Sequence, residues 1–227
     1  MSPHWPDLSD AWSALAGTGS EAAAVGAELL ARWAEPHRSY HTLDHLCAVL
    51  AAVDELAEEA HDTASVRYAA WFHDAVYQGE PGKDEEASAR LAELLLPTCG
   101  LTAERAGEVA RLVRVTAGHA PDPGDLDAEV LCDADLAILA AEPAEYAEYA
   151  AAVREEYAHV ADSDFRSGRA RVLGALLASP RLYHTPLALD RWEERAQANV
   201  SAEIAWLIGD GPAPTAQEPT AAGSPRD

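Results

Sequence analysis

Several residue types are scarce in this chain of 227 residues, and each shortage removes a class of protein. There are only three cysteines, Cys47, Cys99 and Cys132, and they are odd in number and far apart in the sequence. They therefore lack the paired spacing of a zinc knuckle or a redox motif. We expect all three to be plain core residues.

Basic residues are also scarce, with 16 Lys and Arg against 39 Asp and Glu and a formal net charge of -23. Such a chain repels a polyphosphate backbone instead of releasing its counterions, so long nucleic acid is not an expected partner. A small phosphorylated ligand remains compatible with this charge, because a few convergent arginines and a cation can set the local potential.

Long apolar runs are missing as well. No stretch of about 18 apolar residues is present, and no basic start leads into an apolar segment. We therefore expect neither a membrane span nor a secretory signal, and we expect a cytoplasmic protein with no membrane partner. Assembly into a homo-oligomer stays open.

What the chain does have is alanine and leucine, within a hydrophobic share of 48%. These residues favour helices, whereas the β-branched and aromatic residues that favour strands are few, so the fold class we expect is all-α. The length fits a single helical domain over 1–209. Residues 210–227 are mostly Gly, Pro, Ala, Thr and Ser, and this composition predicts a disordered tail.

Apolar residues at three-and-four spacing, together with capping residues and Gly/Pro punctuation, predict where the helices lie. The segment 118–127 is expected to be irregular. Helices are expected over 8–15, 20–35, a stretch beginning at Thr42, 63–72, 84–96, 102–117, 133–140, 143–160, 165–177 and 187–208.

Two positions on these helices carry metal-binding side chains. His45 lies in the first turn of the helix that begins at Thr42, on the face that points toward the core. His73 and Asp74 directly follow an apolar run and precede a Gly-containing loop. Neighbouring helical residues lie about 100° apart, so this pair can approach one ion only near the helix end.

A further carboxylate comes from Asp133 or Asp135, which point to nearly opposite sides of a helix. Asp135 shares its face with apolar residues and is the favoured ligand, whereas Asp133 stands where a helix N-cap is expected. Asp133 remains the alternative. Burying Asp74 and Asp135 is costly without a cation, although each residue taken singly also has an ordinary structural explanation.

The order His, His-Asp, Asp resembles the HD superfamily of metal-dependent phosphohydrolases, and the likeness covers about residues 25–205. In better-understood HD nucleotidases the last aspartate stands in an Ala-Asp-Xaa-Leu setting, which again favours Asp135. Within the superfamily, a bacterial subfamily described as predicted HD phosphohydrolases is similar over the segments 38–45, 70–77, 84–89, 133–139, 153–157 and 168–169.

The resemblance implies a divalent transition metal ion (Mn, Co, Ni, Fe or Zn) held by His45, His73, Asp74 and Asp135. It also implies hydrolysis of a small phosphorylated metabolite, with a nucleotide as the first expectation. Asp74 and Glu85 are the candidate catalytic residues, and Glu85 is equally explained as a first-turn helix acid. The candidate substrate-binding residues are Arg38, His41, His119, Arg154 and Arg169.

Two other functions stay open at this point. One is a di-iron HD oxygenase, whose sites resemble the same core with two extra histidines, whereas here only His119 lies between Asp74 and Asp135. The other is a non-catalytic HD module that binds a ligand without turning it over. The resemblance does not choose among nucleotides, cyclic nucleotides and sugar phosphates as substrates.

Overall fold

The computed structural model describes residues 8–209, and this part of the chain is helical with no strands. The expected all-α class is therefore confirmed, while the predicted disordered tail 210–227 lies outside the described residues. None of the described helices is long and apolar enough to cross a membrane. The α-helices are α1 (Leu8–Ala16), α2 (Ser20–Trp33), α3 (Leu43–Glu55), α4 (Thr63–Phe72), α5 (Lys83–Leu95), α6 (Ala103–Val115), α7 (Leu126–Asp135), α8 (Pro143–Glu156), α9 (Asp162–Ala178), α10 (Pro186–Arg191) and α11 (Glu193–Ile208).

Helix α4 lies at the centre of the first group of helices and packs against α1, α3, α5, α6 and α7. Its sequence is apolar around most of the helix, which suits a helix that is covered on all sides. Trp71 and Phe72 are almost fully buried. The indole N–H of Trp33, at the end of α2, donates to the backbone oxygen of Trp71 at 3.0 Å and so fixes α2 against the end of α4.

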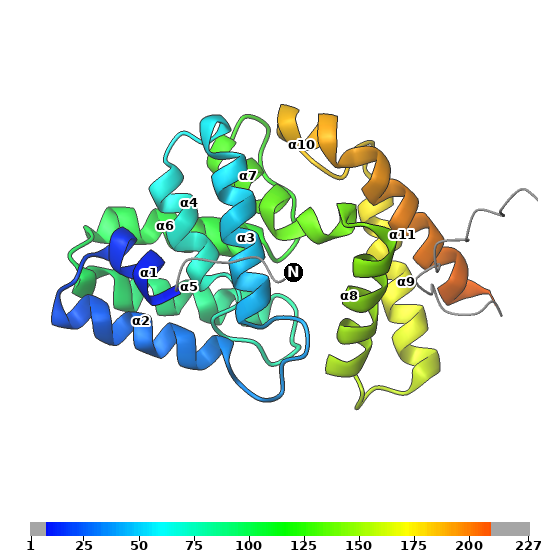
Figure 1. The fold of residues 1–227 in the computed structure, drawn as a ribbon, viewed down its shortest axis with the longest axis horizontal. Helices are drawn as coiled ribbons and strands as arrows, with labels where there is room; N and C mark the ends of the chain where they lie inside the picture. The colour runs from blue at the N-terminus through cyan, green and yellow to red at the C-terminus, as the bar shows by residue number, and fades with distance from the viewer. Residues whose placement is uncertain (1–7, 210–227) are drawn as a thin grey trace, which may run out of the picture.

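Helices α8, α9 and α11 form a second group on the other side of the molecule (Figure 1). The two groups are joined by a 3₁₀ segment, η3 (Leu136–Ala140), which directly continues α7 and packs against α8 and α11. Because α7 ends where η3 begins, Asp135 stands at the junction of the two groups.

Helix α7, which carries Asp133 and Asp135, begins earlier than the sequence indicates. We expected an irregular segment over 118–127 and a helix over 133–140, whereas α7 starts at Leu126 and η3 replaces the predicted helix. Asp125 caps α7 by accepting the backbone N–H of Ala128. The expectation that Asp133 is an N-cap is therefore wrong, because Asp133 lies in the last turn of α7.

The predicted final helix over 187–208 is two helices, α10 and α11, that meet at Trp192. Thr185 caps α10 through its hydroxyl. The three cysteines are free: Cys47 and Cys132 are buried and Cys99 is partly buried, as expected of core residues.

Candidate metal centre

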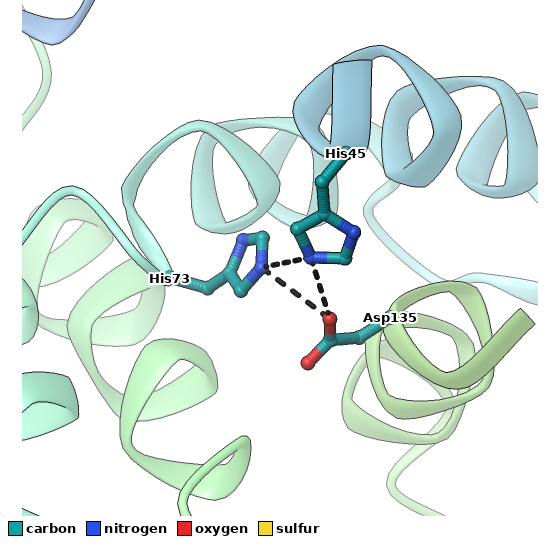
Figure 2. Close-up of side chains that lie close together, drawn as sticks. All are labelled: His45, His73 and Asp135. Carbon is teal, nitrogen blue, oxygen red and sulfur yellow. Dashed lines mark hydrogen bonds and ion pairs between the residues drawn. The ribbon is translucent and has the colours of Figure 1, made fainter. Parts of the chain in front are cut away.

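Three helix ends bring the candidate ligands together. His45 lies in the first turn of α3, His73 is the residue that ends α4, and Asp135 is the last residue of α7. The His-Asp pair therefore stands at a helix end beside a loop, as the sequence predicts. Figure 2 shows the two imidazole rings and the Asp135 carboxylate converging on one point.

The donor atoms of these residues are evenly spaced. His45 Nε2 lies 3.3 Å from His73 Nε2 and 3.2 Å from Asp135 Oδ1, and His73 Nε2 lies 3.4 Å from the same oxygen. Ligands of a divalent transition ion sit at about 2.0–2.2 Å from it and so are separated from one another by about 3.0–3.5 Å. The three atoms therefore match the ligand spacing that such an ion requires, and this group can hold a metal ion.

A backbone oxygen of α4 sets the orientation of the His73 ring. Its Nδ1 lies 2.8 Å from the backbone oxygen of Ala70, one turn earlier on α4. A carbonyl oxygen only accepts, so Nδ1 carries the hydrogen and Nε2 of the neutral ring presents its lone pair to His45 and Asp135. A hydrogen bond from the ring nitrogen that does not face the metal is the usual way in which a metal-binding histidine is oriented.

Asp74 approaches the same centre from one side. Its Oδ2 lies 3.3 Å from His73 Nε2 and 3.9 Å from His45 Nε2, and its side chain is 14% exposed. The backbone oxygen of Asp74 accepts a hydrogen bond from Arg38 at 2.8 Å. Asp74 is thus fixed through its backbone while its carboxylate faces the centre and the neighbouring cavity.

Electrostatics at the centre favour a positive charge. Burial alone raises the pKa of Asp135, but His73, His119 and His45 outweigh it and hold that pKa well below its usual range. The pKa of His45 is lowered by burial. Burial would also lower the pKa of His73, yet the facing carboxylates Asp74 and Asp135 raise it well above its ordinary value. Two partly buried carboxylates thus favour a cation beside Nε2 of His73.

His119 supports Asp135 from the opposite side. Its Nε2 lies 2.8 Å from Asp135 Oδ2, the oxygen that does not face His45. The backbone of His119 has a φ of 47°, in the left-handed region that L-residues rarely adopt. A non-glycine residue keeps this conformation, just past α6, only where its side-chain interactions offset the backbone strain.

A cavity of about 230 Å³ opens beside the centre. Asp74, His119 and Asp135 are among its polar lining residues, and Leu173 of α9 is among its apolar ones. A second, wider hollow of about 610 Å³ reaches His45 and Asp135 between α3, η3 and α8. Tyr40, Tyr149 and Asp135 line both spaces, so the centre borders two cavities.

The three candidate arginines have different surroundings. Arg38 has a fully buried side chain whose five N–H groups donate to Glu35 and to backbone oxygens, including that of Asp74. Arg154 donates to the backbone oxygens of Tyr157 and Val160 beyond the end of α8. Both therefore hold backbone in place and neither lines the cavity.

Arg169 does line the cavity. Its Nε and Nη2 donate to Glu203 and to the Tyr149 hydroxyl, and its Nη1 makes no hydrogen bond with another described residue. Among the three candidates, Arg169 is thus the one placed to bind an anion. Its two partners, the buried Glu203 and the partly buried Tyr149, hold the guanidinium plane still.

Two acidic candidates have clear structural partners. Glu85 lines the cavity, but its carboxylate also accepts the backbone N–H of Gly82 at the start of α5, as expected of a first-turn acid. Asp133 is fully buried and accepts hydrogen bonds from the backbone N–H groups of His184 and Thr185 and from both of their side chains. Asp133 and Asp135 of α7 thus serve different segments, and Asp135 is the one at the centre.

Sequence reasoning missed Glu156, the last residue of α8. Its carboxylate contacts His41, whose Nε2 lies 3.8 Å from Asp74 Oδ2. In the sequence Glu156 is one of two adjacent glutamates on a helix rich in glutamate, and no local signal distinguishes it from its exposed neighbour Glu155. Only the packing of α8 against the segment before α3 identifies it.

Comparison with known proteins found no significant match: no family model fits the chain, and no curated protein and no solved structure is similar to it.

Proposed function

We propose that this protein is a metal-dependent phosphohydrolase whose ion is held by His45, His73 and Asp135, with Asp74 as the fourth ligand. The observation that supports it is the convergence of two imidazole nitrogens and one carboxylate oxygen, 3.2–3.4 Å apart, beside a cavity. When bound, a divalent ion supplies Lewis acidity at a phosphoryl oxygen and makes water a better nucleophile near neutral pH.

The protein's own residues account for the remaining needs of hydrolysis. Nη1 of Arg169 binds a phosphoryl oxygen, and Glu203 and Tyr149 keep the guanidinium in place while it does so. The apolar wall of the cavity, which includes Leu173, covers the leaving group and limits the access of bulk water. A single arginine suits a substrate with one phosphate group better than a polyphosphate.

The metal part of the proposal is tested with the purified full-length chain. We expect about one divalent transition ion per chain by elemental analysis, and loss of that ion in His73→Ala. His159→Ala is the matched control, because His159 is exposed and lines neither cavity at the centre. Equal metal content in the two variants would contradict the assignment of the centre.

The hydrolytic part is tested with p-nitrophenyl phosphate as a general phosphomonoester, in the presence of Mn, Co, Ni, Fe, Zn or Mg in turn. We expect turnover that depends on the metal and that disappears in His73→Ala but not in His159→Ala. A broad screen of phosphorylated metabolites then identifies the leaving group. A chain that binds the ion but hydrolyses no phosphoester would contradict the proposed activity and support a binding module.

One observation favours a second candidate. Two histidines and one carboxylate around an open centre are also the ligand set of ferrous oxygenases. Arg169 at the cavity favours phosphoester hydrolysis, because an anionic substrate needs a cationic partner there. Consumption of dioxygen by the iron-loaded protein in the presence of an organic substrate, without phosphatase activity, would favour the oxygenase.

A further inference from the structure

Both carboxylate oxygens of Glu156, at the end of α8, take part in hydrogen bonds. Its side chain is only 2% exposed. One oxygen, Oε1, accepts the backbone N–H groups of Ser39, Tyr40 and His41 at 2.8–2.9 Å. These three bonds fasten the segment before α3 to the end of α8. They explain Oε1 structurally, but they leave the role of the other oxygen unexplained.

The second oxygen, Oε2, lies 2.7 Å from His41 Nδ1 and accepts the hydroxyl of Tyr77 at 2.8 Å. The His41 ring also stacks on Tyr77, with ring centroids 4.2 Å apart and planes inclined by 27°. The imidazole is thus held by a bond at one nitrogen and by a ring against its face. Its other nitrogen, Nε2, remains on the side of Asp74.

The protonation state of Glu156 decides which nitrogen of the His41 ring carries the hydrogen. Burial by itself raises the pKa of Glu156, but the hydrogen bonds from His41 and the backbone lower it to about 2. Glu156 is therefore a carboxylate at neutral pH and only accepts hydrogen bonds. The short contact at Nδ1 requires a hydrogen on that nitrogen, in the same way that a buried carboxylate fixes the tautomer of a catalytic histidine.

The electrostatics of α8 do not by themselves explain why a glutamate stands at position 156. A carboxylate at the C-terminal end of a helix is disfavoured by the helix dipole, and Glu156 is the last residue of α8. Glu155, one position earlier, is exposed. The buried position of Glu156 is thus explained by what it binds across the interface.

We propose that Glu156 is a positioning residue: it fixes His41 with the proton on Nδ1, so that Nε2 faces the attacking water beside Asp74. The effect on turnover rests on the proposed phosphohydrolase function. The effect on the ring does not, and the two can be measured separately. His41 is then the residue that contacts the reacting water, and Glu156 acts through it.

The variant Glu156→Gln separates positioning from fastening. The amide oxygen can still accept the three backbone N–H groups, so the segment before α3 stays attached to α8. The amide NH₂ then takes the place of Oε2 and donates to His41 Nδ1, so the proton on the neutral ring must move to Nε2. Glu155→Gln is the matched control, since it removes the same charge from the same helix end.

The first measurement is nitrogen NMR on the full-length, metal-free chain labelled with ¹⁵N-histidine, with the His41 signals assigned by their absence in His41→Gln. We expect a protonated Nδ1 in the wild type and in Glu155→Gln, and a bare Nδ1 in Glu156→Gln. A bare Nδ1 in the wild type, or an unchanged ring in Glu156→Gln, would overturn the proposal. The wild-type spectrum is decisive even if the glutamine variant does not fold.

The second measurement is metal-dependent turnover of p-nitrophenyl phosphate. We expect Glu156→Gln to keep its metal content, its melting temperature and its KM while kcat falls about 10–100-fold, the range typical of residues that orient a functional histidine. Glu155→Gln should match the wild type. If the wild type hydrolyses no phosphoester, the proposed function fails and the NMR result still decides whether Glu156 orients His41. Wild-type kcat in Glu156→Gln would overturn the positioning role.

Discussion

The Asp133 carboxylate accepts the backbone N–H of Thr185 at 2.8 Å and its hydroxyl at the same distance, which ties the last turn of α7 to the start of α10. Asp135, two residues later, turns instead to His45 and His73. One turn of helix thus carries a structural aspartate and the aspartate that we propose as a metal ligand, and conservative variants of the two should behave oppositely.

We expect Asp135→Asn to lose its metal, because the variant removes the anionic ligand while keeping its shape. Asp133→Asn should keep its metal but lower the free energy of unfolding by about 1–3 kcal/mol, since an amide NH₂ would face the N–H donors of His184 and Thr185. Elemental analysis and chemical denaturation of both variants measure these effects. Metal loss in Asp133→Asn with retention in Asp135→Asn would reverse the assignment.

A second prediction concerns His119, which supports Asp135 from a left-handed backbone conformation. Asn tolerates this conformation, so His119→Asn should keep the melting temperature while metal affinity falls about 10–100-fold through loss of the bond to Asp135. His119→Ala should lower affinity similarly, because it also removes the bond to Asp135. Metal titration followed by calorimetry checks both, and wild-type affinity in His119→Asn would show that the contact is incidental.

The arginines supply a third prediction. Arg169→Lys removes the planar group that Glu203 and Tyr149 hold at the cavity. The KM for p-nitrophenyl phosphate should rise at least about tenfold, equivalent to about 1.4 kcal/mol of binding. Arg154→Lys, whose parent side chain caps α8 outside the cavity, should leave KM unchanged. Steady-state kinetics decide the matter, and equal KM values would remove Arg169 from the substrate site.

The fourth prediction tests packing away from the site. A Cβ on Gly26 of α2 would collide with the Trp12 indole, whose N–H is bound to the backbone oxygen of Ala22. Gly26→Ala should therefore destabilise the protein by about 1–3 kcal/mol. Gly174→Ala, on α9 with open space around it, should stabilise it by about 0.5–1 kcal/mol. Denaturation curves that shift in the same direction for both would show that Trp12 moves aside at little cost.

Features that depend on local periodicity could be predicted from the residues alone. Alanine and leucine at helical spacing predicted the all-α class, and the apolar run before His73 predicted a helix that ends at the His-Asp pair. The apolar neighbours of Asp135 favoured its face over that of Asp133, even though the helix start was misplaced. These properties are local, because each depends on residues within a few turns of one helix.

Which polar side chains meet became clear only from the folded chain. Glu156 reaches His41 across 115 residues, and Asp133 reaches His184 across 51. Arg38, Arg154 and Arg169 have the same chemistry in the sequence, yet two of them hold backbone and one lines the cavity. The reason is physical, because a charged side chain acts through the partner that lies within hydrogen-bond distance after packing. That partner depends on how α8, α9 and α11 dock. Local sequence patterns do not encode this docking.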